Sequence, residues 1–155
     1  MMLGSGTCDV RALIAAGCPV GLAVDGSASN DSSNMIQEVR QAFLLHRLQY
    51  GASAFSHLDA LAMATTGSAR CLGRSDIGSI RIGACADLAM FRLDELRFSG
   101  AGDPVAALVL CHAHRADRVM VDGHWVVSDG ELVHGDTHVL REQHGKAAMD
   151  LLRNL

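Results

Sequence analysis

Apolar and polar positions along the first half of the chain predict helices arranged around one buried strand. Apolar side chains at helical spacing indicate a short helix over residues 9–17, which begins at an acid and ends at a glycine. The apolar run VGLAV at 20–24 is typical of a strand covered on both faces, as in a parallel sheet between helices. Capping residues ahead of amphipathic patterns then predict helices over 34–50 and 56–72.

The pattern changes after residue 73. Short apolar stretches alternate with glycine in GSIRIGACADLAMFRL (78–93), and VMVDGHWVVSDGELV (119–133) contains two D-G pairs of the kind that form hairpin turns. These features predict a small antiparallel sheet. A short helix is expected between them at 104–111, and a terminal helix weakened by Gly145 is expected over 136–155.

Composition excludes several classes of protein. Of the 155 residues, 49% are hydrophobic and 19% are charged, which is typical of a globular chain and not of a disordered or fibrous one. Because 17 acids outnumber 13 basic residues, nucleic acid is not expected as a partner. No apolar run is long enough to predict a membrane span. The five cysteines show no CxxC pair, which favours a reducing cytoplasm over a disulfide framework.

Asp25 is the most informative position for chemistry, because it stands where the predicted buried strand runs into a loop. Ligands and catalytic groups gather at the carboxyl ends of strands in parallel α/β folds. The alternative is that Asp25 only starts a turn with Gly26, since D-G pairs are common in turns. Position alone leaves both interpretations open.

Four segments in order carry a resemblance to a known family: VGLAVDGSASND, QEVRQAFLL, LDALAMATTGSARCLGRSDIGSIRIGACADLAMF and VMVDGHWVVSDGEL. Together they resemble the C-terminal portion of the amidohydrolase superfamily, from residue 3 to about 135. Within it they are similar to the cytosine, guanine and triazine hydrolase group, and DGSASND looks most like 8-oxoguanine deaminases and hydroxytriazine aminohydrolases. These enzymes hydrolyse C–N bonds other than peptide bonds.

The resemblance implies an α/β fold made of a C-terminal fragment of a (β/α)8 barrel and part of a composite β-sandwich. Residues 1–73 would hold the last strand-helix units of the barrel, 74–135 the sandwich portion and 136–155 a C-terminal helix. Strand 20–24 would be the eighth barrel strand. Because a full barrel needs about 250 residues, this chain resembles roughly the last third of an enzyme.

The same resemblance implies that Asp25 contacts a divalent metal ion, zinc or alternatively iron, and takes a proton from the attacking water. Ser27 and Asn30, in the loop that follows, would orient a purine-like or triazine-like heterocycle. For Asn30, capping of the next helix is an equal alternative. The family's other metal ligands, histidines from earlier strands, have no counterpart here, so we expect the isolated chain to bind no metal and to be inactive.

His112 and His114 form the only HxH pair in the sequence, a spacing that places two imidazoles on one face of a strand. The pair follows the segment PVAALVLC and has no third ligand nearby in sequence, so we expect ordinary surface or interface histidines. His46 is expected to pack or lie at the solvent edge of its helix, and His57 is expected to be solvated.

Two functions remain open at this stage. The first is a portion of a metal-dependent deaminase that acts on a small heterocycle. The second is a non-catalytic truncated domain that acts by self-association or partner binding. Because strand 20–24 would lack its neighbours and expose an apolar face, a homo-oligomer is expected.

Overall fold

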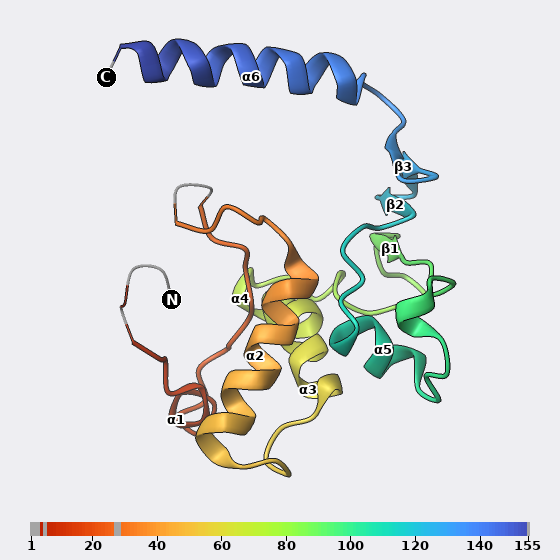
Figure 1. The fold of residues 1–155 in the computed structure, drawn as a ribbon. Helices are drawn as coiled ribbons and strands as arrows, with labels where there is room; N and C mark the ends of the chain where they lie inside the picture. The colour runs from red at the N-terminus through yellow and green to blue at the C-terminus, as the bar shows by residue number, and fades with distance from the viewer. Residues whose placement is uncertain (1–3, 5, 27–28, 155) are drawn as a thin grey trace.

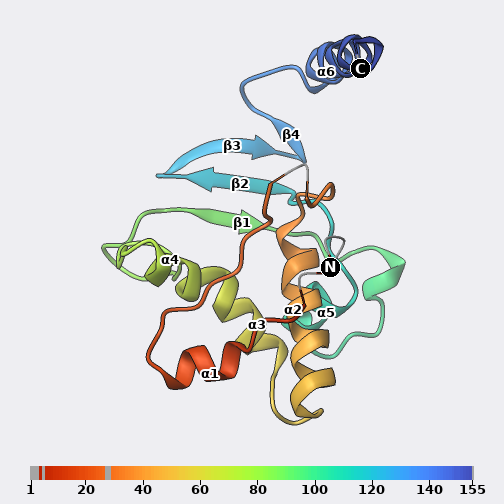
Figure 2. The same ribbon diagram turned by 90° about the vertical axis from the view of Figure 1, so that its left-hand side faces the viewer.

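The computed structural model describes residues 4, 6–26 and 29–154, and it combines a helical body with a small sheet and a separate terminal helix (Figures 1 and 2). In chain order the elements are α1 (Val10–Ala15), α2 (Met35–Tyr50), α3 (His57–Ala62), the π-helical segment η1 (Met63–Gly67), α4 (Ser68–Cys71), β1 (Leu88–Met90), the 3-10 turn η2 (Leu96–Phe98), α5 (Pro104–Leu110), β2 (Arg118–Val121), β3 (His124–Ser128), β4 (Glu131–Leu132) and α6 (Thr137–Arg153).

The predicted helix starts are confirmed, because each one has the cap that the sequence indicates. The Asp9 carboxylate accepts the Ala12 N–H at 3.1 Å, and the Asn34 side chain accepts the Gln37 N–H at 3.1 Å. Ser56 forms a complete capping box with Asp59. Such caps satisfy backbone donors that a helix leaves free in its first turn, so the boundaries are set locally.

Helices α2, α3 and α5 enclose the main core. Val39, Phe43, Ala60 and Val109 form one buried cluster, with Leu22 packed against it. Val39 and Val109 are completely buried. Helix α2 therefore presents the face that its apolar spacing predicts, and the segment before Asp25 is held against that core.

The predicted strand at 20–24 does not form, which corrects the prediction. A strand needs a neighbouring strand to complete its ladder. In the part of the chain that the structure describes, the one sheet consists of β1–β4 and excludes this segment. Leu22 bonds to the helical layer instead: its N–H donates to the Met63 carbonyl at 3.2 Å and to the Ser68 hydroxyl at 3.2 Å, and that hydroxyl lies 2.8 Å from the Leu22 carbonyl.

The four strands form an antiparallel sheet in sequence order. Asp122-Gly123 joins β2 to β3 and Asp129-Gly130 joins β3 to β4, and all four residues have positive φ, between 47° and 78°. These conformations are those of hairpin turns that match strand twist. The two D-G turns and the small sheet are therefore as predicted.

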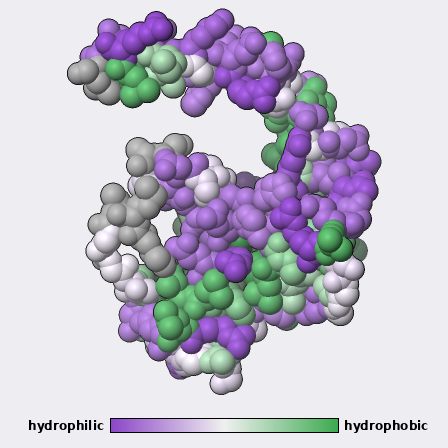
Figure 3. All heavy atoms as spheres, viewed as in Figure 1, coloured by the Kyte–Doolittle hydropathy of each residue, from purple (hydrophilic) through white to green (hydrophobic). Residues whose placement is uncertain are grey.

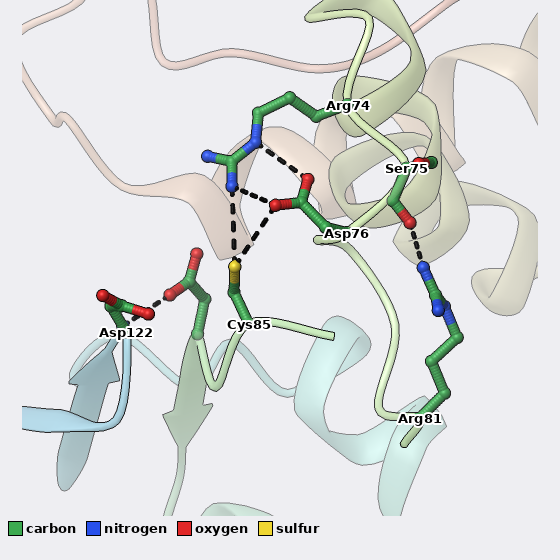
Figure 4. Close-up of polar contacts among 7 residues, drawn as sticks. Arg74, Ser75, Asp76, Arg81, Cys85 and Asp122 are labelled. Atoms are coloured by element: carbon green, nitrogen blue, oxygen red, sulfur yellow. Dashed lines mark hydrogen bonds and ion pairs between the residues drawn. The ribbon is translucent and has the colours of Figure 1, made fainter. Parts of the chain in front are cut away.

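The segment 74–87 has no regular structure, so the strand predicted within 78–93 shrinks to β1. Polar contacts hold the segment in place (Figure 4). Arg74 donates to both Asp76 carboxylate oxygens, and the Cys85 thiol donates to Asp76 at 3.3 Å. Arg74 is the main cause of the lowered pKa of Asp76, followed by the Cys85 thiol. The cluster lies on an exposed loop and ties its two ends together.

Helix α6 forms as predicted but buries none of its residues. It begins at Asp136, whose side chain caps the His138 and Val139 N–H groups, and it extends away from the helical body (Figures 1 and 2). Leu151 and Leu152 on this helix remain more than 60% exposed. No helix in the described residues is long and apolar enough to cross a membrane.

Two glycines allow segment 20–24 to lie directly on the helical layer. A Cβ on Gly67 would stand 2.5 Å from the Val20 carbonyl oxygen, and a Cβ on Gly21 would stand 2.7 Å from the Ser68 Cα. Real Cβ atoms do not approach backbone this closely. The two backbones therefore touch where only hydrogen fits between them.

We predict that Gly67→Ala lowers the free energy of unfolding by about 1–3 kcal/mol, because the added methyl group forces the two backbones apart. Gly102→Ala is the matched control, since a Cβ there meets nothing within 4 Å. Its effect should stay within about 0.5 kcal/mol. Urea unfolding followed by circular dichroism measures both, and equal effects of the two changes would contradict the close packing.

Candidate functional site

Asp25 lies directly after segment 20–24, at the edge of the helical body, with an exposed side chain. Its φ of 66° is left-handed, which is uncommon for a residue other than glycine and is tolerated best by Asn and Asp. The Oδ1 atom of Asp25 accepts the Gly26 N–H at 2.8 Å. This contact fixes the carboxylate over its own turn.

The Gly26 N–H, and after it the Ser29 hydroxyl, lower the pKa of Asp25. The Gly26 N–H stabilises the ionised form by donating a hydrogen bond to it, and the nearby Ser29 hydroxyl favours the same form. Asp25 is therefore a carboxylate at neutral pH, the form that accepts a proton or coordinates a cation. The turn with Gly26 is present as well, so the two sequence interpretations of Asp25 are compatible.

Asn30 fixes the loop that follows Asp25. Its amide nitrogen donates to the Val24 carbonyl at 2.9 Å and to Glu38 Oε1 at 2.6 Å, and its amide oxygen accepts the Ser32 hydroxyl at 3.1 Å. Its amide thus bonds within the chain, while the cap of α2 is Asn34. Contact of Asn30 with a substrate stays a prediction. Ser27, the other expected substrate-binding residue, lies outside the described residues.

The residues present do not suffice for a metal centre. Across residues 4, 6–26 and 29–154, no three side chains of His, Cys, Asp or Glu come together as a cation site would require. His112 and His114 stack with ring centroids 6.3 Å apart, but no third ligand joins them. A catalytic zinc ion takes three protein ligands and an open position, so Asp25 alone does not fit one.

A second feature, a cavity of about 610 Å3 among α1, segment 17–20 and helices α2 and α3, was not foreseen from the sequence. His46 and Phe55 line it, with ring centroids 4.3 Å apart and nearly parallel. His46 is only 7% exposed, and its Nε2 atom has no hydrogen-bond partner. The spacing of Ile36, Val39, Phe43 and His46 along α2 is the sequence signal that places this histidine on the buried face.

His57 corrects another expectation, since it is not simply solvated. Its Nε2 lies 3.2 Å from Asp103 Oδ2. Asp103 caps α5, so this contact joins the start of α3 to the start of α5. It therefore acts within the scaffold.

Comparison with known proteins identifies the family. The amidohydrolase family matches residues 1–126. The chain belongs to the amidohydrolase family. It is 58% identical to an 8-oxoguanine deaminase of Pseudomonas aeruginosa over 152 residues, which are 98% of this chain and 34% of that enzyme. The chain thus spans about a third of the length of this curated relative.

Solved amidohydrolase structures contain the same arrangement of elements. An adenosine deaminase from Xanthomonas campestris with bound zinc superposes with a TM-score of 0.88 and 32% identity, covering 99% of this chain and 35% of that one. An atrazine chlorohydrolase from Arthrobacter aurescens complexed with zinc gives 0.84 and 36%, covering 91% of this chain and 32% of that one. The prediction of a C-terminal part of a barrel with part of a sandwich is confirmed.

We predict that Asn30→Asp destabilises the chain by about 1–3 kcal/mol at pH 7, because two donated hydrogen bonds are lost and a carboxylate faces Glu38 and the Val24 carbonyl. Repulsion raises the pKa of the new carboxylate, so the penalty should grow as pH rises through that pKa and shrink toward pH 4. Urea unfolding at pH 7 and at pH 4 measures this change in the penalty. Gln49→Glu is the control, since it also replaces an amide by a carboxylate but at an exposed position of α2. It should show no such pH dependence.

Proposed function

We propose that this chain forms part of a metal-dependent hydrolase that deaminates a purine-like or triazine-like heterocycle, with 8-oxoguanine as the first substrate to test. The 58% identity to 8-oxoguanine deaminase across nearly the whole chain carries the proposal. Other relatives are deaminases of 5-methylthioadenosine and S-adenosylhomocysteine, which also remove an amino group from a purine ring. Hydrolytic deamination of a purine is thus common to these relatives, and 8-oxoguanine is the more specific part of the proposal.

Asp25 is the residue proposed to carry the chemistry. Its ionised carboxylate stands on a turn held by Gly26, at the end of a segment that is packed backbone to backbone on the helical layer. Such a rigidly placed carboxylate is suited to receive a proton from an attacking water. The loop pinned by Asn30 would set one wall of the substrate pocket next to it.

A chimera tests this role directly. The third of the Pseudomonas aeruginosa 8-oxoguanine deaminase that matches this chain is replaced by this chain, and deamination of 8-oxoguanine is followed by ultraviolet absorbance. We expect activity in the chimera and a loss of about 10²–10⁴-fold in kcat with Asp25→Asn, because the isosteric amide cannot accept a proton.

The matched control in the chimera is Glu142→Gln, which removes an exposed carboxylate of α6 far along the chain from Asp25. It should leave kcat unchanged. An active chimera in which Asp25→Asn retains full activity would refute the proposed role of this carboxylate. Thermal melts of each variant establish that folding is preserved.

A separate prediction concerns the chain produced on its own. Since Asp25 has no companion ligands among the described residues, we expect less than about 0.1 zinc per chain after dialysis and no turnover of 8-oxoguanine. Elemental analysis measures the zinc content. Retention of one zinc per chain by the purified protein would show that a complete ligand set exists without further polypeptide.

A further inference from the structure

Asn30 holds the chain both just before and just after Asp25. Its amide nitrogen donates to the Val24 carbonyl at 2.9 Å, and its backbone N–H donates to the Gly26 carbonyl at 2.9 Å. Asp25 itself has a φ of 66°, a conformation that a residue other than glycine keeps only where its surroundings hold it. One residue therefore bridges the turn on which the proposed carboxylate stands.

Glu38 of α2 sets the direction in which the Asn30 amide faces. Its Oε1 atom lies 2.6 Å from the Asn30 amide nitrogen, and a carboxylate oxygen can only accept. The nitrogen therefore points toward Glu38 and, with its second hydrogen, toward the Val24 carbonyl. The amide oxygen faces the other way and accepts the Ser32 hydroxyl at 3.1 Å and the Ser32 N–H at 3.4 Å. All four hydrogen-bonding positions of the amide are thus used within the chain.

Helix α2 gives Glu38 a fixed position. Val39, the next residue, is completely buried in the main core. The Asn34 side chain, which caps the helix, also donates to the His114 carbonyl at 3.1 Å and so ties the first turn to the segment after α5. A hydrogen bond to a charged group is stronger than one between neutral groups. Glu38 therefore connects the loop after Asp25 to a part of the helix that packing holds in place.

We propose that Glu38 is a positioning residue for the Asp25 carboxylate, because it holds the Asn30 amide against the Val24 carbonyl. This role rests on the proposed function, in which Asp25 receives a proton from the attacking water. Reacting groups work only when supporting residues hold them within about 0.5 Å of the productive geometry. Loss of the Glu38 contact should therefore slow the reaction without removing any group that reacts.

The charge of Glu38 offers a different explanation for its place in the helix. An acidic residue in the first turn interacts favourably with the positive end of the helix dipole, whether or not it accepts a hydrogen bond. Two substitutions separate these effects. Glu38→Ala removes both the charge and the acceptor, whereas Glu38→Gln removes the charge and keeps an oxygen that can accept the Asn30 N–H. Positioning predicts that glutamine restores what alanine loses.

Glu38→Ala should fold, because it leaves the core side chains in place. On the face of the molecule drawn in Figure 3, hydrophobic side chains gather on the helical body, whereas the surface around the start of α2 is hydrophilic. Glu38 does not belong to the buried cluster that includes Val39 and Phe43. Circular dichroism establishes that each variant retains its helices.

The substitutions are made in the chimera with the Pseudomonas aeruginosa enzyme, and deamination of 8-oxoguanine is measured. We expect kcat to fall about tenfold with Glu38→Ala, because misplacement of a reacting group by about 1 Å costs up to about 100-fold. With Glu38→Gln, kcat should stay within about threefold of the unsubstituted chimera. Gln37→Ala, at the preceding exposed position, is the matched control and should leave kcat unchanged. Equal losses with alanine and glutamine at position 38 would overturn the positioning role.

Nuclear magnetic resonance on the chain alone measures the same link without catalysis. Nitrogen-15 relaxation reports the order parameter of the Asp25 backbone amide, which is about 0.85 for rigid backbone and below about 0.6 for flexible backbone. We expect the rigid value in the unsubstituted chain, in Glu38→Gln and in Gln37→Ala, and the flexible value in Glu38→Ala. One proton signal of the Asn30 side-chain amide should also shift in Glu38→Ala. An unchanged order parameter in that variant would overturn the proposal.

The two experiments distinguish failure of the positioning role from failure of the proposed function. An inactive unsubstituted chimera refutes the proposed function, and the order parameter of Asp25 then supports or overturns its link to Glu38 by itself. An active chimera in which Glu38→Ala keeps its full kcat overturns the positioning role and leaves the proposed function standing.

Discussion

The direct backbone contact between segment 20–24 and the π-helical turn sets where the chain reaches Asp25, the residue on which the proposed function depends. Gly21 and Gly67 remove the side chains that would separate the two backbones, and the Ser68 hydroxyl bonds both polar groups of Leu22. This hydroxyl takes part of the role that a neighbouring strand has in a sheet. Asn30 adds a hydrogen bond to the Val24 carbonyl, so the segment is held at Leu22 and again just before Asp25.

The local geometry around Asp25 follows from this anchoring. The chain leaves segment 20–24 through a left-handed residue, and the Gly26 N–H both stabilises that turn and keeps the carboxylate ionised. Asn30 then ties the loop back to Val24 and to α2 through Glu38. Hydrogen bonds thus connect Asp25 to Gly26, and connect Asn30 to Val24 and to Glu38 of α2.

The exposed apolar side chains and the isolated position of the Asp25 carboxylate are both features of how this chain folds on its own. Among its described residues, the chain holds no group of three metal-ligating side chains, and it holds a cavity beside His46, whose buried Nε2 atom has no hydrogen-bond partner there.

The sequence by itself determined the features that depend on near neighbours. Caps at Asp9, Asn34 and Ser56 fixed the helix starts, and the D-G pairs fixed the hairpins, because each acts through hydrogen bonds or φ angles within a few residues. Only the tertiary structure decided the fate of segment 20–24, the π-helical turn and the cavity beside His46. Strand formation depends on a distant partner, and an apolar run is the same in sequence whether that partner is present or not.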